Sequence, residues 1–129
     1  MRDNEGAQHY KNIALPNAMS NLKILSDAGV KIAMGTDSGP AARFQGYFEH
    51  LEMSMMVNAG MTPMQVLQSA TSVAADCLGL NYLGTLEAGK WADIVVLDAD
   101  PLTDINNTKS VSQVWIAGNL VPATQVSAP

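Results

Sequence analysis

Residues 30–39, VKIAMGTDSG, join a short apolar run to a polar turn that contains glycine. The run over residues 30–35 is nearly unbroken in apolar side chains, which is typical of a strand buried on both faces of a sheet. Asp37 follows just past the end of this run. In α/β sheets and barrels, the loops at the carboxyl ends of the strands build the functional sites. The stretch therefore predicts a buried strand that presents a candidate functional carboxylate.

Helical patterns lie on both sides of this run, and with it they predict an α/β architecture built from repeated β and α units. Upstream, apolar residues recur every three to four positions from Pro16 until Gly29 ends the pattern. Downstream, one apolar stripe predicts a helix over residues 44–58. A further helix is predicted from Pro63 to about Cys77, with that cysteine on its inner face.

The beginning of that last helix carries several start signals. Thr62 is placed to cap it, Pro63 occupies the first helical position, and Gln65 completes a capping box. Met61 and Val66 have the spacing of a hydrophobic staple. Together these residues predict a well-defined helix start.

The last third of the chain changes to β structure. Residues 94–97, IVVL, and residues 111–117 predict two strands rich in β-branched side chains. A turn at residues 118–119 allows residues 120–121 to pair back onto the second strand as a hairpin. The order of elements is therefore helix, strand and two helices, followed by a small β segment.

Composition limits the possible functions. The chain has 129 residues, of which 47% are apolar and 15% charged, and its net charge is −5. The apolar content excludes a disordered tail, and the acidic balance argues against a nucleic acid partner. No apolar run reaches membrane-spanning length and no signal peptide is visible, so we expect a cytoplasmic protein without a membrane partner. The single cysteine excludes a disulfide framework and a Cys-only zinc site.

Two interpretations of Asp37 remain open on the residues alone. A carboxylate followed by Ser38 and Gly39 can ligate a metal or take a proton from water. The same carboxylate can instead cap the following turn through its own side chain. Arg43, later in the loop, either meets an anionic group or is a solvated charge.

The other candidate side chains have no partner in the sequence. His50 lies two positions before Glu52, so the two do not share a helix face, and His50 is expected on the helix surface or rim. His9 is expected to have no role, and Cys77 is expected to be a buried thiol. Methionines that we expect in a core or an interface are Met53, Met55, Met56, Met61 and Met64.

Several stretches in this order resemble the amidohydrolase superfamily of metal-dependent hydrolases. They are GVKIAMGTDSG at 29–39, AGMTP at 59–63, Ala70-Thr71 with Ala74-Ala75, GTLEAGKWADIVVLD at 84–98, and Asp100-Pro101-Leu102. The combination is specific and covers about residues 17–121. It looks most like the branch that holds imidazolonepropionase-like and Xaa-Pro dipeptidase-like enzymes.

Members of this superfamily carry a (β/α)8 barrel and a small β-sandwich. The resemblance implies that residues 30–35 correspond to the eighth barrel strand. It implies that Asp37 binds the metal, zinc, and shuttles the proton of the attacking water. Ser38, Gly39 and Arg43 would then border the substrate, which is implied to be a small molecule or a dipeptide with a C–N amide bond.

The superfamily's HxH pair and its other histidine ligands have no counterpart here, so we expect a C-terminal fragment that is inactive as an isolated chain. The expected parts are a leader (1–16), the last barrel units (17–80), strands of the β-sandwich (81–121) and a loose tail (122–129). A lone eighth strand has two open edges, so we expect a homo-oligomer through residues 30–35, or pairing of that strand with the chain's own later strands. A non-catalytic scaffold or oligomerisation module, and one subunit of a split hydrolase, are alternative functions.

Overall fold

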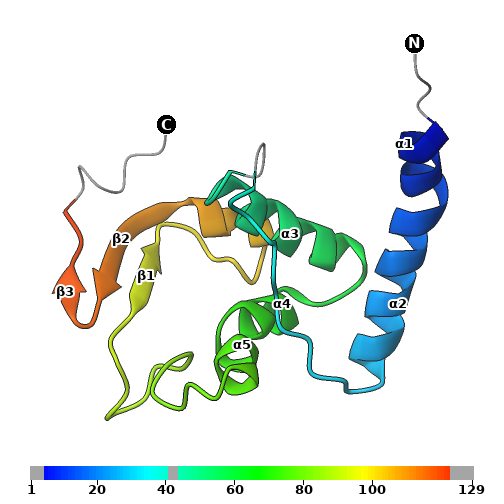
Figure 1. The fold of residues 1–129 in the computed structure, drawn as a ribbon. Helices are drawn as coiled ribbons and strands as arrows, with labels where there is room; N and C mark the ends of the chain where they lie inside the picture. The colour runs from blue at the N-terminus through cyan, green and yellow to red at the C-terminus, as the bar shows by residue number, and fades with distance from the viewer. Residues whose placement is uncertain (1–4, 41–43, 123–129) are drawn as a thin grey trace.

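The computed structural model describes residues 5–40 and 44–122. A long helical rod, a group of three helices and a small antiparallel sheet lie side by side (Figure 1). No helix within the described ranges is long and apolar enough to cross a membrane. In chain order the elements are α1 (Glu5–His9), the π-helical turn η1 (Tyr10–Ala14), α2 (Leu15–Asp27), α3 (Tyr47–Asn58), α4 (Pro63–Ala70), α5 (Ser72–Cys77), β1 (Ile94–Leu97), the 3₁₀ turn η2 (Ile105–Lys109), β2 (Val111–Ile116) and β3 (Asn119–Leu120).

The N-terminal helix begins earlier than the sequence predicts. Residues 5–27 are helical throughout, although residues 1–16 were expected to be a leader. In η1 the Leu15 N–H bonds back to the Tyr10 carbonyl, and this wider π turn directly precedes Pro16, whose ring would clash with the backbone of a regular helix. Apolar periodicity marks a face that packs against other elements. Residues 5–13 are all exposed, whereas α2 packs Leu22 against the core, so the sequence pattern reveals α2 and misses the first half of the rod.

Residues 30–35 are extended but form no strand, so the predicted buried strand is wrong. Ile32 and Met34 pack against the helical core, whereas Val30 is 49% exposed. The Met34 N–H donates to the Ser69 carbonyl (3.0 Å) and ties the segment to α4. Among the described residues the segment pairs with none of the three strands, so the expected pairing with later strands is also wrong. Helices cover one side of residues 30–35. A strand is buried on both faces only inside a sheet, and the described residues supply no strand beside this segment.

Helix α3 begins at Tyr47 rather than at Phe44. Gly46, immediately before it, has φ of +84°, a left-handed conformation that does not continue a right-handed helix. The Glu49 carboxylate accepts a hydrogen bond from the Gly46 N–H (2.6 Å) and so closes the first turn. Phe44 is left outside the helix and is 70% exposed.

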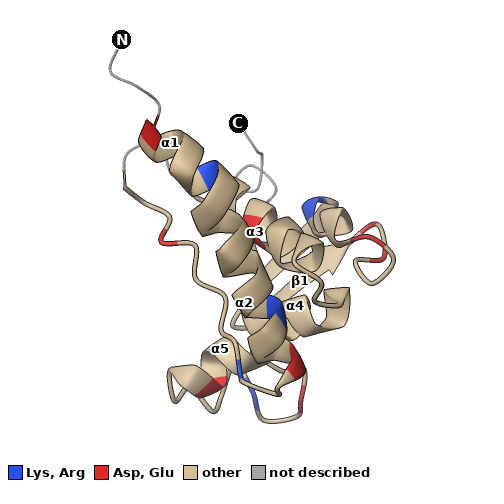
Figure 2. Cartoon of the chain, turned by 90° about the vertical axis from the view of Figure 1, so that its right-hand side faces the viewer, with Lys and Arg blue, Asp and Glu red and all other residues tan. Residues whose placement is uncertain are grey.

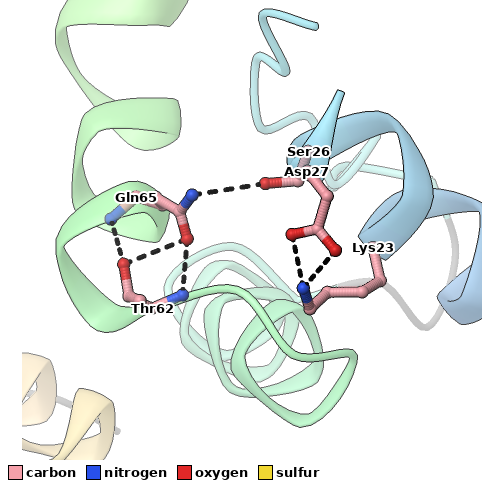
Figure 3. Close-up of polar contacts among 5 residues, drawn as sticks. All are labelled: Lys23, Ser26, Asp27, Thr62 and Gln65. Atoms are coloured by element: carbon pink, nitrogen blue, oxygen red, sulfur yellow. Dashed lines mark hydrogen bonds and ion pairs between the residues drawn. The ribbon is translucent and has the colours of Figure 1, made fainter. Parts of the chain in front are cut away.

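Helix α4 begins as predicted, and the capping box is confirmed (Figure 3). Thr62 Oγ1 accepts from the Gln65 N–H (3.2 Å), and Gln65 Oε1 accepts from the Thr62 N–H (2.8 Å). The side-chain amide of Gln65 also reaches Ser26 Oγ on α2 (3.5 Å). The cap therefore also links the rod to the helix group.

The helix predicted over residues 63–77 is divided at Thr71 into α4 and α5. Thr71 has φ −127° and ψ −89°, and its hydroxyl donates to the Leu67 carbonyl (2.7 Å), a local bond that competes with helical geometry. The break rotates the second helix, so Ala75 is buried and Cys77 is exposed. The prediction that Cys77 is a buried thiol is therefore wrong.

Both predicted strands and the hairpin are confirmed. β1 pairs with β2 in an antiparallel ladder that sets Ile94 opposite Trp115, with an irregularity between Val96 and Leu97. β2 continues into β3, where Trp115 pairs with Leu120. β1 lies at one edge of this three-stranded sheet.

The core lies where the helix group meets η2. Its buried side chains are Met53, Met56, Met61, Val66 and Ile105. The core interpretation of the methionines is thus confirmed for three of them, whereas Met64 is 48% exposed. The charged residues are few and scattered over the elements rather than gathered in one patch (Figure 2).

Candidate functional site

Asp37 lies in an exposed turn between the extended segment and α3. Its φ is +52°, in the left-handed region, which costs a non-glycine residue roughly 1–2 kcal/mol. Aspartate tolerates this conformation better than most residues, and such a conformation persists where surrounding contacts hold it. Thr36 and Ser38, the two neighbours of Asp37, supply contacts that hold this conformation.

One carboxylate on α3 holds both neighbours of Asp37. Glu49 Oε1 accepts hydrogen bonds from the hydroxyls of Thr36 (3.2 Å) and Ser38. Within the turn, the Ser38 N–H donates to Thr36 Oγ1 (3.2 Å). Since Glu49 Oε2 accepts from the Gly46 N–H, the turn is attached to the beginning of α3.

Glu52 reaches the same loop one helical turn later. Its Oε1 lies 3.4 Å from the Gly35 N–H, just before the turn. Residues three apart share a face of a helix, so α3 directs Glu49 and Glu52 toward the loop together. Neither residue is among the side chains predicted for the site from the sequence. Two glutamates at that spacing, following an aspartate flanked by two hydroxyl residues, are the signal that could have identified them.

Glu49 is held in its ionised form. The hydrogen bond from the Ser38 hydroxyl is the largest influence and holds the pKa of Glu49 below its ordinary value of 4.5. Burial acts in the opposite direction, and the hydrogen bonds from Gly46 and Thr36 support the lowering. An ionised carboxylate only accepts hydrogen bonds, which is what these three donors require.

His50, the next residue of α3, joins this helix to η2. Its Nδ1 lies 2.9 Å from Thr108 Oγ1, and the Thr108 hydroxyl donates its one hydrogen to the Ile105 carbonyl (2.8 Å). Nδ1 must therefore be the donor to Thr108. Burial is the largest cause that lowers the pKa of His50, and the charge of Lys109 lowers it further, while Glu49 opposes the shift.

The helices and the sheet line a mostly apolar, partly open cavity of about 630 Å³. His50 and Thr108 line it together with Met53, Leu67 and Trp91. Neither Asp37 nor its neighbours line this cavity. The cavity and the carboxylate-bearing turn are therefore separate features of the chain.

The structure brings together part of the predicted site. Ser38 lies beside Asp37, but its hydroxyl donates to Glu49. Gly39 continues the turn with φ of +125°. Arg43 lies outside the described residues. His9 ends α1 on the exposed surface.

A hydrolytic metal centre needs three or four protein ligands. In residues 5–40 and 44–122, no three His, Cys, Asp or Glu side chains lie close enough together to hold a metal ion. Asp37 is thus a single candidate ligand. The described residues alone do not fit a zinc site.

These features define an α/β chain with a carboxylate held in a strained turn after an extended apolar segment. Residues 11–121 match the family model described as "Amidohydrolase family". The chain belongs to the amidohydrolase family, which confirms the resemblance carried by its motifs.

Curated relatives and solved structures agree with this assignment. The chain is 37% identical over 99 residues to ochratoxinase of Aspergillus niger, a match that covers 72% of this chain and 20% of the relative. It is 31% identical over 94 residues to a 5-methylthioadenosine/S-adenosylhomocysteine deaminase of Bacillus cereus, covering 67% of this chain and 22% of the relative. A crystal structure of a Xaa-Pro dipeptidase with bound methionine in the active site aligns with a TM-score of 0.74 and 34% identity, covering 82% of this chain and 26% of that one. The chain thus spans about a fifth to a quarter of the length of these proteins.

Proposed function

We propose that the chain supplies the C-terminal part of an amidohydrolase that cleaves C–N bonds of small molecules or dipeptides. The observation that carries the proposal is Asp37, held in a left-handed turn by a carboxylate of the following helix. The family match and the hydrolytic relatives support it.

Asp37 is the proton-transfer group in this proposal. It takes a proton from the attacking water as a general base and returns it to the leaving nitrogen as a general acid. Zinc belongs to the proposal only as a metal shared with ligands from outside the described residues, because one carboxylate cannot hold it. Ser38, Gly39 and Arg43 would lie in the loop beside the substrate.

The proposal also assigns an architecture. Residues 17–80 would be the last units of a (β/α)8 barrel, and residues 81–121 would be strands of the small β-sandwich. The extended segment 30–35 supports this, because it has the position of a barrel strand without sheet neighbours among the described residues. The open segment also supports self-association of the isolated chain, and a cytoplasmic location is part of the same proposal.

A hybrid enzyme tests the proposed role. Residues 11–121 would replace the corresponding segment of the aligned Xaa-Pro dipeptidase, and hydrolysis of a Xaa-Pro dipeptide would be followed. We expect a measurable rate that Asp37→Asn lowers by about 10² or more, the usual scale of general acid–base catalysis. Asp76→Asn is the matched control, because Asp76 is an exposed partner of Lys31 (2.6 Å) away from the turn. Equal rates for the two variants would refute the role of Asp37.

A further inference from the structure

Both neighbours of Asp37 donate hydrogen bonds to one side chain on α3, Glu49. We propose that Glu49 is a positioning residue, which holds the turn that carries Asp37 in its left-handed conformation through the hydroxyls of Thr36 and Ser38. The consequence for catalysis rests on the proposed function of Asp37. The effect of Glu49 on the turn does not rest on it.

The two oxygens of Glu49 have different tasks. Oε1 accepts from both hydroxyls that flank Asp37, and Oε2 accepts from the Gly46 N–H at the start of α3 (2.6 Å). Both oxygens are therefore engaged in holding the backbone. Glu49 acts through the turn, whereas Asp37 is the exposed carboxylate of the pair.

The other hydrogen bonds of Gly35, Thr36 and Ser38 differ from those to Glu49. The Ser38 N–H bond to Thr36 Oγ1 (3.2 Å) lies within the turn and leaves it free to move as a unit. Glu52 contacts Gly35 at 3.4 Å, which is before the turn. The single hydrogen of the Thr36 hydroxyl is shared between Glu49 Oε1 (3.2 Å) and Ser38 Oγ (3.1 Å), so the Ser38 hydroxyl makes the more direct bond from the turn to Glu49.

Matched substitutions test separately the effects of the Glu49 carboxylate and of the hydroxyl that donates to it. Glu49→Gln keeps the size but replaces one accepting oxygen by an NH2 donor, which faces other donors. Ser38→Ala removes the hydroxyl that donates to Glu49 and keeps the N–H of residue 38 that donates to Thr36 Oγ1, and Ser38→Thr restores the hydroxyl. Glu87→Gln is the same chemical change at an exposed residue that pairs with Lys90 (3.6 Å) far along the chain.

The measurement is the amide exchange rate of Ser38 in the 129-residue chain, followed by magnetisation-transfer NMR at about neutral pH. We expect Glu49→Gln and Ser38→Ala each to speed the exchange of the residue 38 amide, relative to its intrinsic rate, by about tenfold, the effect of one lost hydrogen bond of ordinary strength. Ser38→Thr and Glu87→Gln should stay within about twofold of the parent chain. The Val66 amide, bonded to the Thr62 carbonyl (3.1 Å), reports whether the fold is intact.

Unchanged Ser38 exchange in Glu49→Gln, with Val66 still protected, would overturn the inference. If Glu49→Gln loses Val66 protection, the two Ser38 variants decide. Faster exchange in Ser38→Ala alone supports the inference, and equal exchange in both variants overturns it. The hybrid-enzyme rate of Asp37→Asn bears only on the proposed function, so the two failures are distinguishable.

Discussion

Gly84 lies against the break between α4 and α5, where there is no room for a side chain. A Cβ atom there would stand 2.7 Å from the Ala75 Cβ and 2.9 Å from the Thr71 carbonyl oxygen, and φ is +85°. We expect Gly84→Ala to lower the free energy of unfolding by roughly 2–4 kcal/mol, because overpacking adds to left-handed strain. Urea unfolding followed by circular dichroism measures the loss.

Gly89 is the matched control for this substitution. Its φ is +90°, but a Cβ atom there would meet nothing within 4 Å. Gly89→Ala should therefore cost only the conformational strain, about 1–2 kcal/mol. Equal losses in the two variants would show that the close approach at Gly84 has no energetic weight.

His50 should make the stability depend on pH. Because burial lowers its pKa below the ordinary value of 6.5, the unfolded chain binds more protons than the folded chain between the two values. The contribution of neutral His50 to the free energy of unfolding is therefore fully present at a pH above the ordinary pKa of 6.5. It is lost as the pH falls through that value toward the lower folded-state pKa. We expect a lower melting temperature at about pH 5.5 than at about pH 7.5, and a smaller difference in His50→Asn. The same pH difference in both chains would contradict this assignment.

At the scale of elements, the start of α4 depends on Thr62 and Gln65. Thr62→Ala removes the side-chain acceptor of the capping box and should destabilise the chain by about 1 kcal/mol. Thr62→Ser keeps the hydroxyl and should behave like the parent chain within about 0.5 kcal/mol. Thermal unfolding of the three chains tests this, and an unchanged melting temperature in Thr62→Ala would show that the cap is dispensable.

The elements that the sequence predicts well are those fixed by local signals. The start at Thr62 and the strands from Ile94 and Val111 depend on caps, turns and β-branched residues within a few positions. The break at Thr71 is marked by no glycine or proline, so the continuous apolar pattern over residues 63–77 does not reveal it. Residues 30–35 have the composition of a buried strand, but only neighbouring strands could make them one.

The same distinction applies to the candidate site. Asp37 is predictable because position after an apolar run is a property of the sequence alone. The hydroxyls of Thr36 and Ser38 are visible there too, but their acceptor is on α3, at Glu49. Which face of that helix meets the turn depends on how α3 packs, so the sequence identifies the carboxylate and not the residue that holds it.

At the scale of the whole molecule, large apolar side chains remain exposed on every part of the described chain. Ile24 on the rod is 60% exposed, Val30 is 49% exposed and Val95 on the edge strand is 56% exposed. Contiguous apolar surface marks interaction sites. We propose that another copy of the chain or another polypeptide covers these side chains.

We expect the isolated chain to self-associate through residues 30–35. Sedimentation velocity over the micromolar range should show a mass above the monomer that rises with concentration. Val30→Lys should weaken this association, whereas Met64→Lys, at a residue of similar exposure on α4, should not. A monomer throughout the concentration range would contradict the expectation.

The zinc content of the dialysed 129-residue chain, measured by plasma mass spectrometry beside its hydrolysis of a Xaa-Pro dipeptide, tests the central claim most directly. If Asp37 is one ligand of a centre completed from outside the described residues, the chain should retain far less than one zinc per molecule and show no chelator-sensitive hydrolysis. One tightly held zinc per chain, lost in Asp37→Ala together with a chelator-sensitive activity, would contradict the account.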